Sequence, residues 1–517
     1  MSPNRRIALN MIATYGRSLL GLACGLFSGR WILMALGEVD YGLFGLVGGL
    51  SAFMVFLNDL FAGAISRYYA VSVGKSLATG DIEDCRRWFC TALMIHTIGP
   101  AILLAIGYPI GIWAVKSMLT IPPDRIEACV WVWRFTCITS FASMVNVPFK
   151  AMYIAKQYIA ELTIYNVATT ILNFMMAFYM SSHPREWLIL YAGWSCALAL
   201  VPHILIGTRA AIVFQECRIR IKYFFEFARM RDLGVYVTYR FVGAFFSMMQ
   251  SQGNAILINK YMGPSFNATM AIGNTVAGHT VSLSTSMSGA IGPAIFNAYG
   301  AKDSKRMLQL VNCASKVGTI LYLAFMIPVS LEIDALVNLW LKEPPVQSSL
   351  ICLFILAAYF TERISDGEVN AIYATANIKR FQMVLALWCF VGVVLGWLFL
   401  QLGMGIFGVG LAIIIFKALI MVSRVIFARI EAGISAWRWI KGIFVPIMAV
   451  TAFCLIIGVL PQLIMDVSFL RVMVTTLVVQ AALWPMTWFC VLNNTEREYI
   501  ISRIKGLTGR FATKGTD

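Results

Sequence analysis

The sequence predicts an all-α membrane protein of about fourteen transmembrane helices, arranged as two pseudo-symmetric six-helix lobes followed by a C-terminal helix pair. Three observations predict this class. The 517 residues are 59% hydrophobic and only 13% charged, whereas about a quarter of the residues of a soluble domain are charged. Apolar runs of spanning length follow one another along the chain. Basic residues gather in alternate loops between these runs.

The apolar runs have the length that a bilayer requires. Each reaches the ~20 residues that a helix needs to cross about 30 Å of hydrocarbon. Strands would need an alternating pattern and a closed barrel, and no such alternation is present. The runs cover roughly residues 8–36, 41–66, 89–118, 127–149, 159–181, 187–213, 233–259, 266–297, 308–331, 347–374, 381–401, 404–423, 442–461 and 468–491.

The loop charges set the expected orientation. Loops on one side hold basic groups such as Lys75, Arg87 and Arg306, while loops on the other side hold few, among them Lys116 and Arg185. The positive-inside rule therefore predicts a multi-pass membrane protein with both termini in the cytoplasm. The same rule accounts for the net charge of +16. Because no nucleic-acid motif or soluble basic platform accompanies the charge, no nucleic-acid partner is expected.

The chain divides into five predicted parts. These are an N-lobe (1–215), a basic cytoplasmic connector (216–232), a C-lobe (233–430), a helix pair (431–492) and a basic cytoplasmic tail (493–517).

Short matches between the halves indicate an internal duplication. The stretch 37–74 begins and ends in glycine, as does 263–300, and Ala62-Gly63-Ala64-Ile65 aligns with Ser288-Gly289-Ala290-Ile291. Ala151-Met152-Tyr153 likewise aligns with Ala371-Ile372-Tyr373. Because six helices per half is an even number, the repeats are expected to run parallel about an axis normal to the membrane.

No pattern for catalysis or cofactor binding is present. The sequence has no phosphate-binding glycine loop and no paired-carboxylate metal motif. Its cysteines and histidines lack metal-ligand spacing. We therefore expect a transporter rather than an enzyme, with no metal and no cofactor, and with coupling to H⁺ or Na⁺ as an open possibility.

Charges inside spans are the candidate site residues, because each costs roughly 2.5–3.5 kcal/mol on the insertion scale unless it faces a partner or a wet cavity. Arg17 and Arg240 occupy similar places in the two repeats and would form a cationic site if they faced one another. Guanidinium groups bind pyrophosphate bidentately. The alternative for each arginine is a snorkelling or structurally paired role near the inner surface. The further candidates for a cationic cavity are Arg67, Arg134, Lys316 and Lys417.

Three acidic residues are candidates for ion coupling. Asp59 lies in the second span without an adjacent basic residue, so it could bind an ion or pair with an arginine such as Arg17. Glu362 and Asp366 lie four residues apart on one helix face. Their cluster is either a self-neutralising structural network or an ion-coupling site.

The whole pattern resembles the multidrug/oligosaccharidyl-lipid/polysaccharide (MOP) exporter superfamily, and within it the bacterial polysaccharide flippases. The residues that carry the resemblance are Gly37-x-x-x-Tyr41-Gly42-Leu43, Ala62 to Tyr69, and Ser288 to Ala294. It implies a flippase that moves undecaprenyl-pyrophosphate-linked O-antigen or capsule units to the outer leaflet by alternating access. The resemblance implies the bacterial inner membrane as the location. We expect a monomer among membrane lipids, with polysaccharide polymerase or glycosyltransferases as partners.

Three alternatives stay open. A drug or small-molecule antiporter and a lipid II flippase share the expected fold. A membrane glycosyl polymerase or ligase would need an acidic or metal site and usually a large outer loop, and neither is visible in the sequence.

Overall fold

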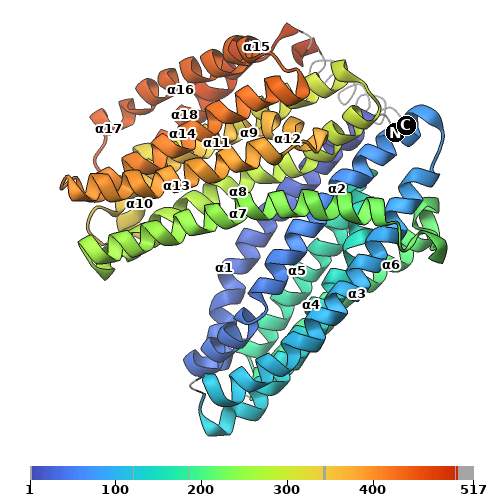
Figure 1. Ribbon diagram of the computed structural model, residues 1–517. Helices are drawn as coiled ribbons and strands as arrows, with labels where there is room; N and C mark the ends of the chain where they lie inside the picture. The colour runs from blue at the N-terminus through green and yellow to red at the C-terminus, as the bar shows by residue number, and fades with distance from the viewer. Residues whose placement is uncertain (1–2, 120, 184–185, 342–344, 495, 499–517) are drawn as a thin grey trace, which may run out of the picture. The chain divides into compact units, whose positions relative to one another are not determined.

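A computed structural model describes residues 3–119, 121–183, 186–341, 345–494 and 496–498 (Figure 1). Within this part of the chain there are only helices, turns and irregular segments. Nine helices are long and apolar enough to cross a membrane, and the bent pair α11–α12 makes a tenth span. The helices α1, α2, α7 and α8 are not among these ten, although each has the length of a span. The predicted fold class is therefore confirmed.

The bounds of the long helices are as follows. The first half contains α1 (Pro3–Gly49), α2 (Ala52–Thr79), α3 (Glu83–Trp113), α4 (Ile126–Ala155), α5 (Ile159–Ser181) and α6 (Leu188–Val213). The second half contains α7 (Phe227–Met262), α8 (Pro264–Gly300), α9 (Ser304–Leu331), α11 (Ser348–Arg363) with α12 (Asp366–Thr375), α13 (Lys379–Gln401) and α14 (Gly405–Ala432). The remaining helices are α10 (Ile333–Trp340), α15 (Ala436–Trp439), α16 (Val445–Gly458), α17 (Leu460–Ile464) and α18 (Phe469–Met486).

The first two spans differ from the prediction. The sequence predicts a loop at 37–40, but the chain bends there at Gly37, whose φ is 74° and ψ 167°, and then continues as helix to Gly49. Only glycine adopts such a conformation without strain, so this position kinks α1 instead of ending it. The second helix consequently begins at Ala52 and runs to Thr79, beyond the predicted end at residue 66.

The tenth predicted span is broken. Helices α11 and α12 meet at a bend of 48°. The break falls at Ile364 and Ser365, inside the cluster of charged residues around Glu362. The short helix α10, just before this span, was not predicted.

The described chain forms two compact units. Unit 1 comprises residues 1–242, 289–310 and 373–379, and unit 2 comprises 243–288, 311–372 and 380–517. Unit 1 thus contains the first six spans together with one end each of α7, α8, α9 and α12. The division into lobes, connector, helix pair and tail remains a prediction, and most of the predicted tail, 499–517, lies outside the described residues.

Unit 1 is built around α4. This helix packs against α2, α3 and α6, while α1 packs mainly along α5 (Figure 1). A core of buried residues, including Leu43, Val132, Trp133 and Met180, joins one end of α1 to α4, α5 and α6.

The predicted connector closes one end of unit 1. Tyr223 is buried there, and the Thr91 hydroxyl of α3 donates a 3.0 Å hydrogen bond to its carbonyl oxygen. Lys156, just after α4, pairs with Glu216 at 2.7 Å.

Unit 2 combines the remainder of the second half with the C-terminal helices. Helix α11 packs along α14, and their apolar residues form one core with Ile258 of α7 and Tyr322 of α9. A second core joins α9 to α16 and α18. Glu332, almost fully buried after α9, pairs with Arg471 of α18 at 2.9 Å and accepts a 2.8 Å hydrogen bond from Thr475. The C-terminal helices are therefore anchored on α9.

A reciprocal contact inside unit 1 has the spacing expected of a duplication. A Cβ built on Gly74 of α2 would overlap the carbonyl oxygen of Asn297 in α8, and a Cβ built on Gly300 of α8 would overlap that of Val71 in α2. The repeat pairs Gly74 with Gly300 and Val71 with Asn297 at one common offset of 226 residues. Gly74 contacts Asn297, and its repeat equivalent Gly300 contacts Val71, which is the repeat equivalent of Asn297. The contact is therefore symmetric with respect to the repeat. We call these four residues the glycine junction.

The anchoring of the C-terminal helices leads to a first prediction. Glu332→Ala would remove the buried carboxylate that pairs with the half-buried Arg471 guanidinium. Loss of one partner of a fully buried ion pair costs about 3–5 kcal/mol, which is the upper bound for this change. We expect the variant to unfold at a clearly lower temperature in detergent, measured by tryptophan fluorescence. Asp334→Ala, which removes an exposed carboxylate two residues away, is the control. Equal unfolding temperatures for the two variants would contradict the anchoring role.

The glycine junction leads to a second prediction. Gly74→Ala and Gly300→Ala should separate the ends of α2 and α8, because the added methyl group has no room. Gly63→Ala and Gly289→Ala lie in the same two helices with no atom within 4 Å of the added Cβ and serve as matched controls. Hydrogen–deuterium exchange of the peptides around 71 and 297 should rise in the first pair only. A rise in all four variants, or in none, would refute the tight contact.

Candidate functional site

Arg67 lies deep in unit 1, about three turns before the end of α2. Its side chain is 5% exposed. The guanidinium donates hydrogen bonds of 3.1 Å to the carbonyl oxygen of Tyr373 and 2.6 Å to that of Ala374. Both carbonyls belong to the last turn of α12, which carries the negative end of the helix dipole. The Tyr373 carbonyl also accepts a 3.3 Å hydrogen bond from the Ala376 N–H. Arg67 therefore caps α12, rather than marking the end of a span.

Arg240 approaches the same turn of α12 from α7. Its guanidinium carbon lies 4.4 Å from the ring centre of Tyr373, within the range of a cation–π contact. The Arg67 guanidinium in turn lies 4.5 Å from the ring centre of Tyr68 and 5.7 Å from that of Tyr236. The structure thus brings two predicted site arginines together around Tyr373. We call Arg67, Tyr68, Tyr236, Arg240 and Tyr373 the Tyr373 cluster.

Arg17 belongs to a different group. Lys150 of α4 interacts electrostatically with Arg17 of α1 and Asp59 of α2, and also with His203 of α6. These residues form what we call the Lys150 cluster. Arg17 is half-buried, whereas Asp59 and Lys150 are exposed. The single site predicted from Arg17 and Arg240 thus corresponds to two groups in unit 1, each with its own neighbours.

The two clusters carry positive charge that no close carboxylate cancels. Among the described residues, neither Arg17, Arg67 nor Arg240 forms an ion pair within 4.0 Å. Asp59 is the one acidic member of the Lys150 cluster, against the two cations Arg17 and Lys150. A guanidinium among apolar helices is stable only where dipoles, rings, water or a bound anion replace its hydration. These two clusters are consequently the best candidates for an anion site.

Three other predicted cations have local partners. Arg134 contacts the Tyr108 hydroxyl at 3.4 Å and the Trp131 ring at 4.6 Å, and both aromatic residues are exposed on the surface of unit 1. Lys316 of unit 2 is buried and pairs with Glu496 at 2.9 Å. Lys417 pairs with Glu362 at 2.8 Å. None of the three belongs to the Tyr373 or Lys150 cluster.

The predicted acidic cluster is an ion-pair network. Glu362 accepts from Lys417 and, at 3.1 Å, from Arg424 of α14. Asp366 pairs with Arg363 at 2.7 Å and with Arg424 at 3.6 Å. Arg424 therefore bridges the two sides of the α11–α12 break, and the carboxylates neutralise the cations around them. This geometry accounts for the charges structurally, while ion coupling by Glu362, Asp366 or Asp59 remains a prediction.

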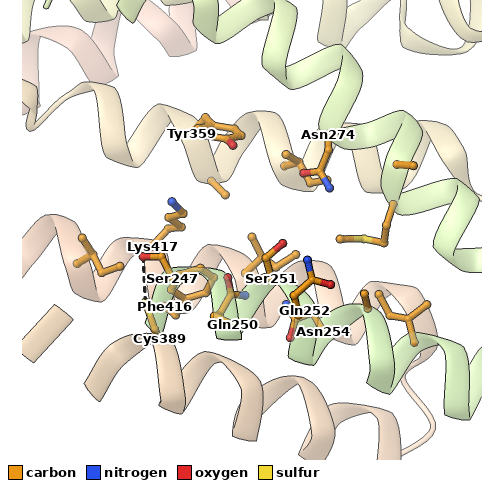
Figure 2. Close-up of a pocket in the computed structure, with 18 residues that line it drawn as sticks. Ser247, Gln250, Ser251, Gln252, Asn254, Asn274, Tyr359, Cys389, Phe416 and Lys417 are labelled. Carbon is orange, nitrogen blue, oxygen red and sulfur yellow. Dashed lines mark hydrogen bonds between the residues drawn. The ribbon is translucent and has the colours of Figure 1, made fainter. Parts of the chain in front are cut away.

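Unit 2 contains a polar cavity of about 410 Å³ between α7, α8, α11, α13 and α14 (Figure 2). Its polar lining includes Ser247, Ser251, Tyr359 and Lys417. Four side-chain amides also line it: Gln250, Gln252, Asn254 and Asn274. Asn254 is buried, and its side-chain oxygen has no hydrogen-bond partner among the described residues. We call this cavity the amide pocket.

Some of these residues could not be recognised as site residues from the sequence. Lys150 follows an apolar run that ends at residue 149, so it was assigned to an inner loop, whereas α4 continues to Ala155. The run Gln250-Ser251-Gln252-Gly253-Asn254 does give a signal, because five non-apolar residues interrupt a long span. The only sign of Tyr373 in the sequence is that Ala371-Ile372-Tyr373 aligns with Ala151-Met152-Tyr153 in the internal repeat.

The fold was compared with those of known proteins. No family model matches the sequence, and no curated protein sequence matches it either. Solved structures do match over most of the chain. One is an outward-facing multidrug resistance MATE family transporter of the MOP superfamily, with a TM-score of 0.69 and 12% identity over 84% of this chain and 96% of that one. The chain has the MATE fold.

Two further MATE-fold structures are similar to this chain. A MOP superfamily transporter from Pyrococcus furiosus, described as having a binding pocket of reverse polarity that suggests a different function, matches with a TM-score of 0.62 and 13% identity over 85% of this chain and 97% of that one. The Vibrio cholerae MATE transporter VcmN in the bent form matches with a TM-score of 0.59 and 15% identity over 82% and 98%. With its apolar helices, the chain is a multi-pass membrane protein.

Proposed function

We propose that the protein is a flippase of the MOP superfamily that moves undecaprenyl-pyrophosphate-linked oligosaccharide from the cytoplasmic to the outer leaflet of the inner membrane. Its product would serve surface polysaccharide or lipopolysaccharide synthesis. The observation that supports this most is the positive charge of the Tyr373 and Lys150 clusters, which close carboxylates do not cancel. A pyrophosphate carries the matching charge, and guanidinium and ammonium groups bind it through charge-assisted hydrogen bonds.

Alternating access follows from this function. A polar headgroup must enter from one side and leave on the other, so helices that touch in one state must separate in the other. The glycine junction is the contact we expect to separate, because backbones in contact without intervening side chains form a tight but small seal. We propose that this junction lies at the cytoplasmic side, with both termini, because it is next to the basic residues Lys75, near the end of α2, and Lys302, just after α8.

The driving force need not come from a nucleotide. Exporting an anion from a cell with a negative interior is favourable by about 2.3 kcal/mol per charge per 100 mV. Coupling to H⁺ or Na⁺ through Asp59 would add to this term. Polysaccharide polymerase or glycosyltransferases, acting before and after transport, are the expected partners of a monomeric flippase.

A drug antiporter is the second candidate, and the similar structures that are multidrug MATE transporters favour it. A cationic drug would need an unpaired acidic group in the transport path. Asp59 is exposed and interacts with Lys150, while Glu362 is occupied by Lys417 and Arg424. The local charge therefore opposes a cation. Uptake of a fluorescent organic cation by proteoliposomes separates the candidates, since the flippase should transport none.

The arginines of the two clusters provide the main functional test. Arg17→Ala with Arg240→Ala removes one cation from each cluster. A charge-assisted hydrogen bond contributes about 1.5–3 kcal/mol, so each loss should weaken anion binding by about tenfold or more. In cells that depend on this protein, lipid-linked oligosaccharide should accumulate in the inner leaflet and surface polysaccharide should fall. Arg17→Lys with Arg240→Lys should retain partial activity because the charge stays.

The control for this test is Arg209→Ala. Arg209 pairs with Glu161 between α6 and α5 at an exposed position, so its loss removes a span arginine outside both clusters. Delivery to the outer leaflet at the wild-type rate by the double alanine variant, at equal protein abundance, would reject the proposed anion site.

A further inference from the structure

We infer that the amide pocket of unit 2 is the site that recognises the uncharged saccharide part of the substrate, through hydrogen bonds to sugar hydroxyl and acetamido groups. This inference rests on the proposed function and extends it, because it assigns the glycan to a place separate from the cationic clusters. The uncharged residues Gln250, Asn254 and Asn274 of the lining have no part in the proposed anion site.

The walls of the amide pocket offer side-chain amides that can bond to a ligand. Of the four side-chain amides in the lining, those of Gln252 and Asn274 are exposed, and that of Asn254 is buried with an oxygen that has no hydrogen-bond partner among the described residues. Each amide offers two N–H donors and one acceptor oxygen. Figure 2 shows Asn274 on one side of the cavity and Gln252 and Asn254 on the other. Amides on opposing walls suit a ligand that both donates and accepts, which describes a sugar.

The second step is burial at one wall. Asn254 is 4% exposed, and its side-chain oxygen is buried without a hydrogen-bond partner among the described residues. A buried acceptor left unsatisfied costs about 1–3 kcal/mol. A ligand hydroxyl that reaches this oxygen would recover that loss, so sugars with a hydroxyl at the matching place would be preferred over analogues that lack it.

The third step is charge. The one cation in the lining, Lys417, is neutralised by Glu362 at 2.8 Å. The pocket therefore has neither a free anion for a cationic drug nor a free cation for a phosphate. Tyr359 adds an aromatic wall beside Lys417, as Figure 2 shows. The volume of the amide pocket, about 410 Å³, lies within the range of about 300–1,000 Å³ typical of small-molecule sites.

The test compares carriers with and without sugar on the purified full-length protein in nanodiscs. The protein is incubated with a lipid extract that contains both glycosylated undecaprenyl pyrophosphate and the sugar-free carrier, then washed and weighed by native mass spectrometry. Each retained lipid is identified by its mass, so the sugar need not be known beforehand. The measured quantity is the ratio of glycosylated to sugar-free carrier that stays bound.

Two kinds of variant address the pocket. Gln250→Ala with Asn274→Ala removes two amides, and Ala271→Leu fills part of the cavity while leaving all amides in place. Both should lower the retained ratio about tenfold, since two lost hydrogen bonds of about 0.7 kcal/mol each amount to that factor. Asn166→Ala, which removes an amide that bonds within α5 of unit 1, should keep the wild-type ratio.

The outcomes separate the two proposals. Wild-type protein that retains both carriers without preference, or pocket variants with the wild-type ratio, would overturn the saccharide site and leave the flippase proposal standing. Wild-type protein that retains neither carrier would contradict both.

Discussion

A guanidinium group among apolar helices needs oxygen, aromatic or water neighbours, and this requirement governs the interior of unit 1. Arg67 meets it with two carbonyls at the end of α12. Arg240 meets it with the ring of Tyr373. Neither solution cancels the positive charge as a carboxylate would. The residues that position these arginines therefore also leave an electrostatic field that attracts an anion, which is the property that the proposed function uses.

Unit 2 shows the opposite treatment of charge. Lys316, Lys417, Arg363 and Arg424 all have carboxylate partners. In the lining of the amide pocket, the polar groups other than Lys417 are neutral amides and hydroxyls. An anionic lipid-linked sugar has both kinds of chemistry in one molecule, a charged pyrophosphate and a neutral glycan. The two proposals assign the pyrophosphate to the charged clusters of unit 1 and the glycan to the neutral amides of the amide pocket.

The sequence predicted the elements better than their ends. Apolar length alone located the long helices, but it cannot show where a helix continues past its apolar part, because polar residues are accommodated once other helices cover them. Arg67 was therefore expected at a span end, whereas it is buried well inside α2. Lys150 was assigned to a loop, whereas α4 extends beyond it.

The site partners were harder to predict than the charges. Arg17 and Arg240 were recognised because a charge in an apolar run is visible in one dimension, while Tyr373 and Ala374 lie more than 300 residues from Arg67 along the chain. The repeat gave partial guidance. Its offset of 226 residues relates the two sides of the glycine junction, although the sequence alone could not show that the equivalent residues touch.

The most direct measurement of the central claim is a cryo-EM structure of the protein in nanodiscs with farnesyl pyrophosphate, a prenyl diphosphate without sugar. The account predicts diphosphate density within hydrogen-bonding distance of Arg17 and Lys150, or of Arg240, in unit 1. Density beside Lys417 in unit 2, or Arg17 and Arg240 both facing acyl chains with no diphosphate near them, would contradict it.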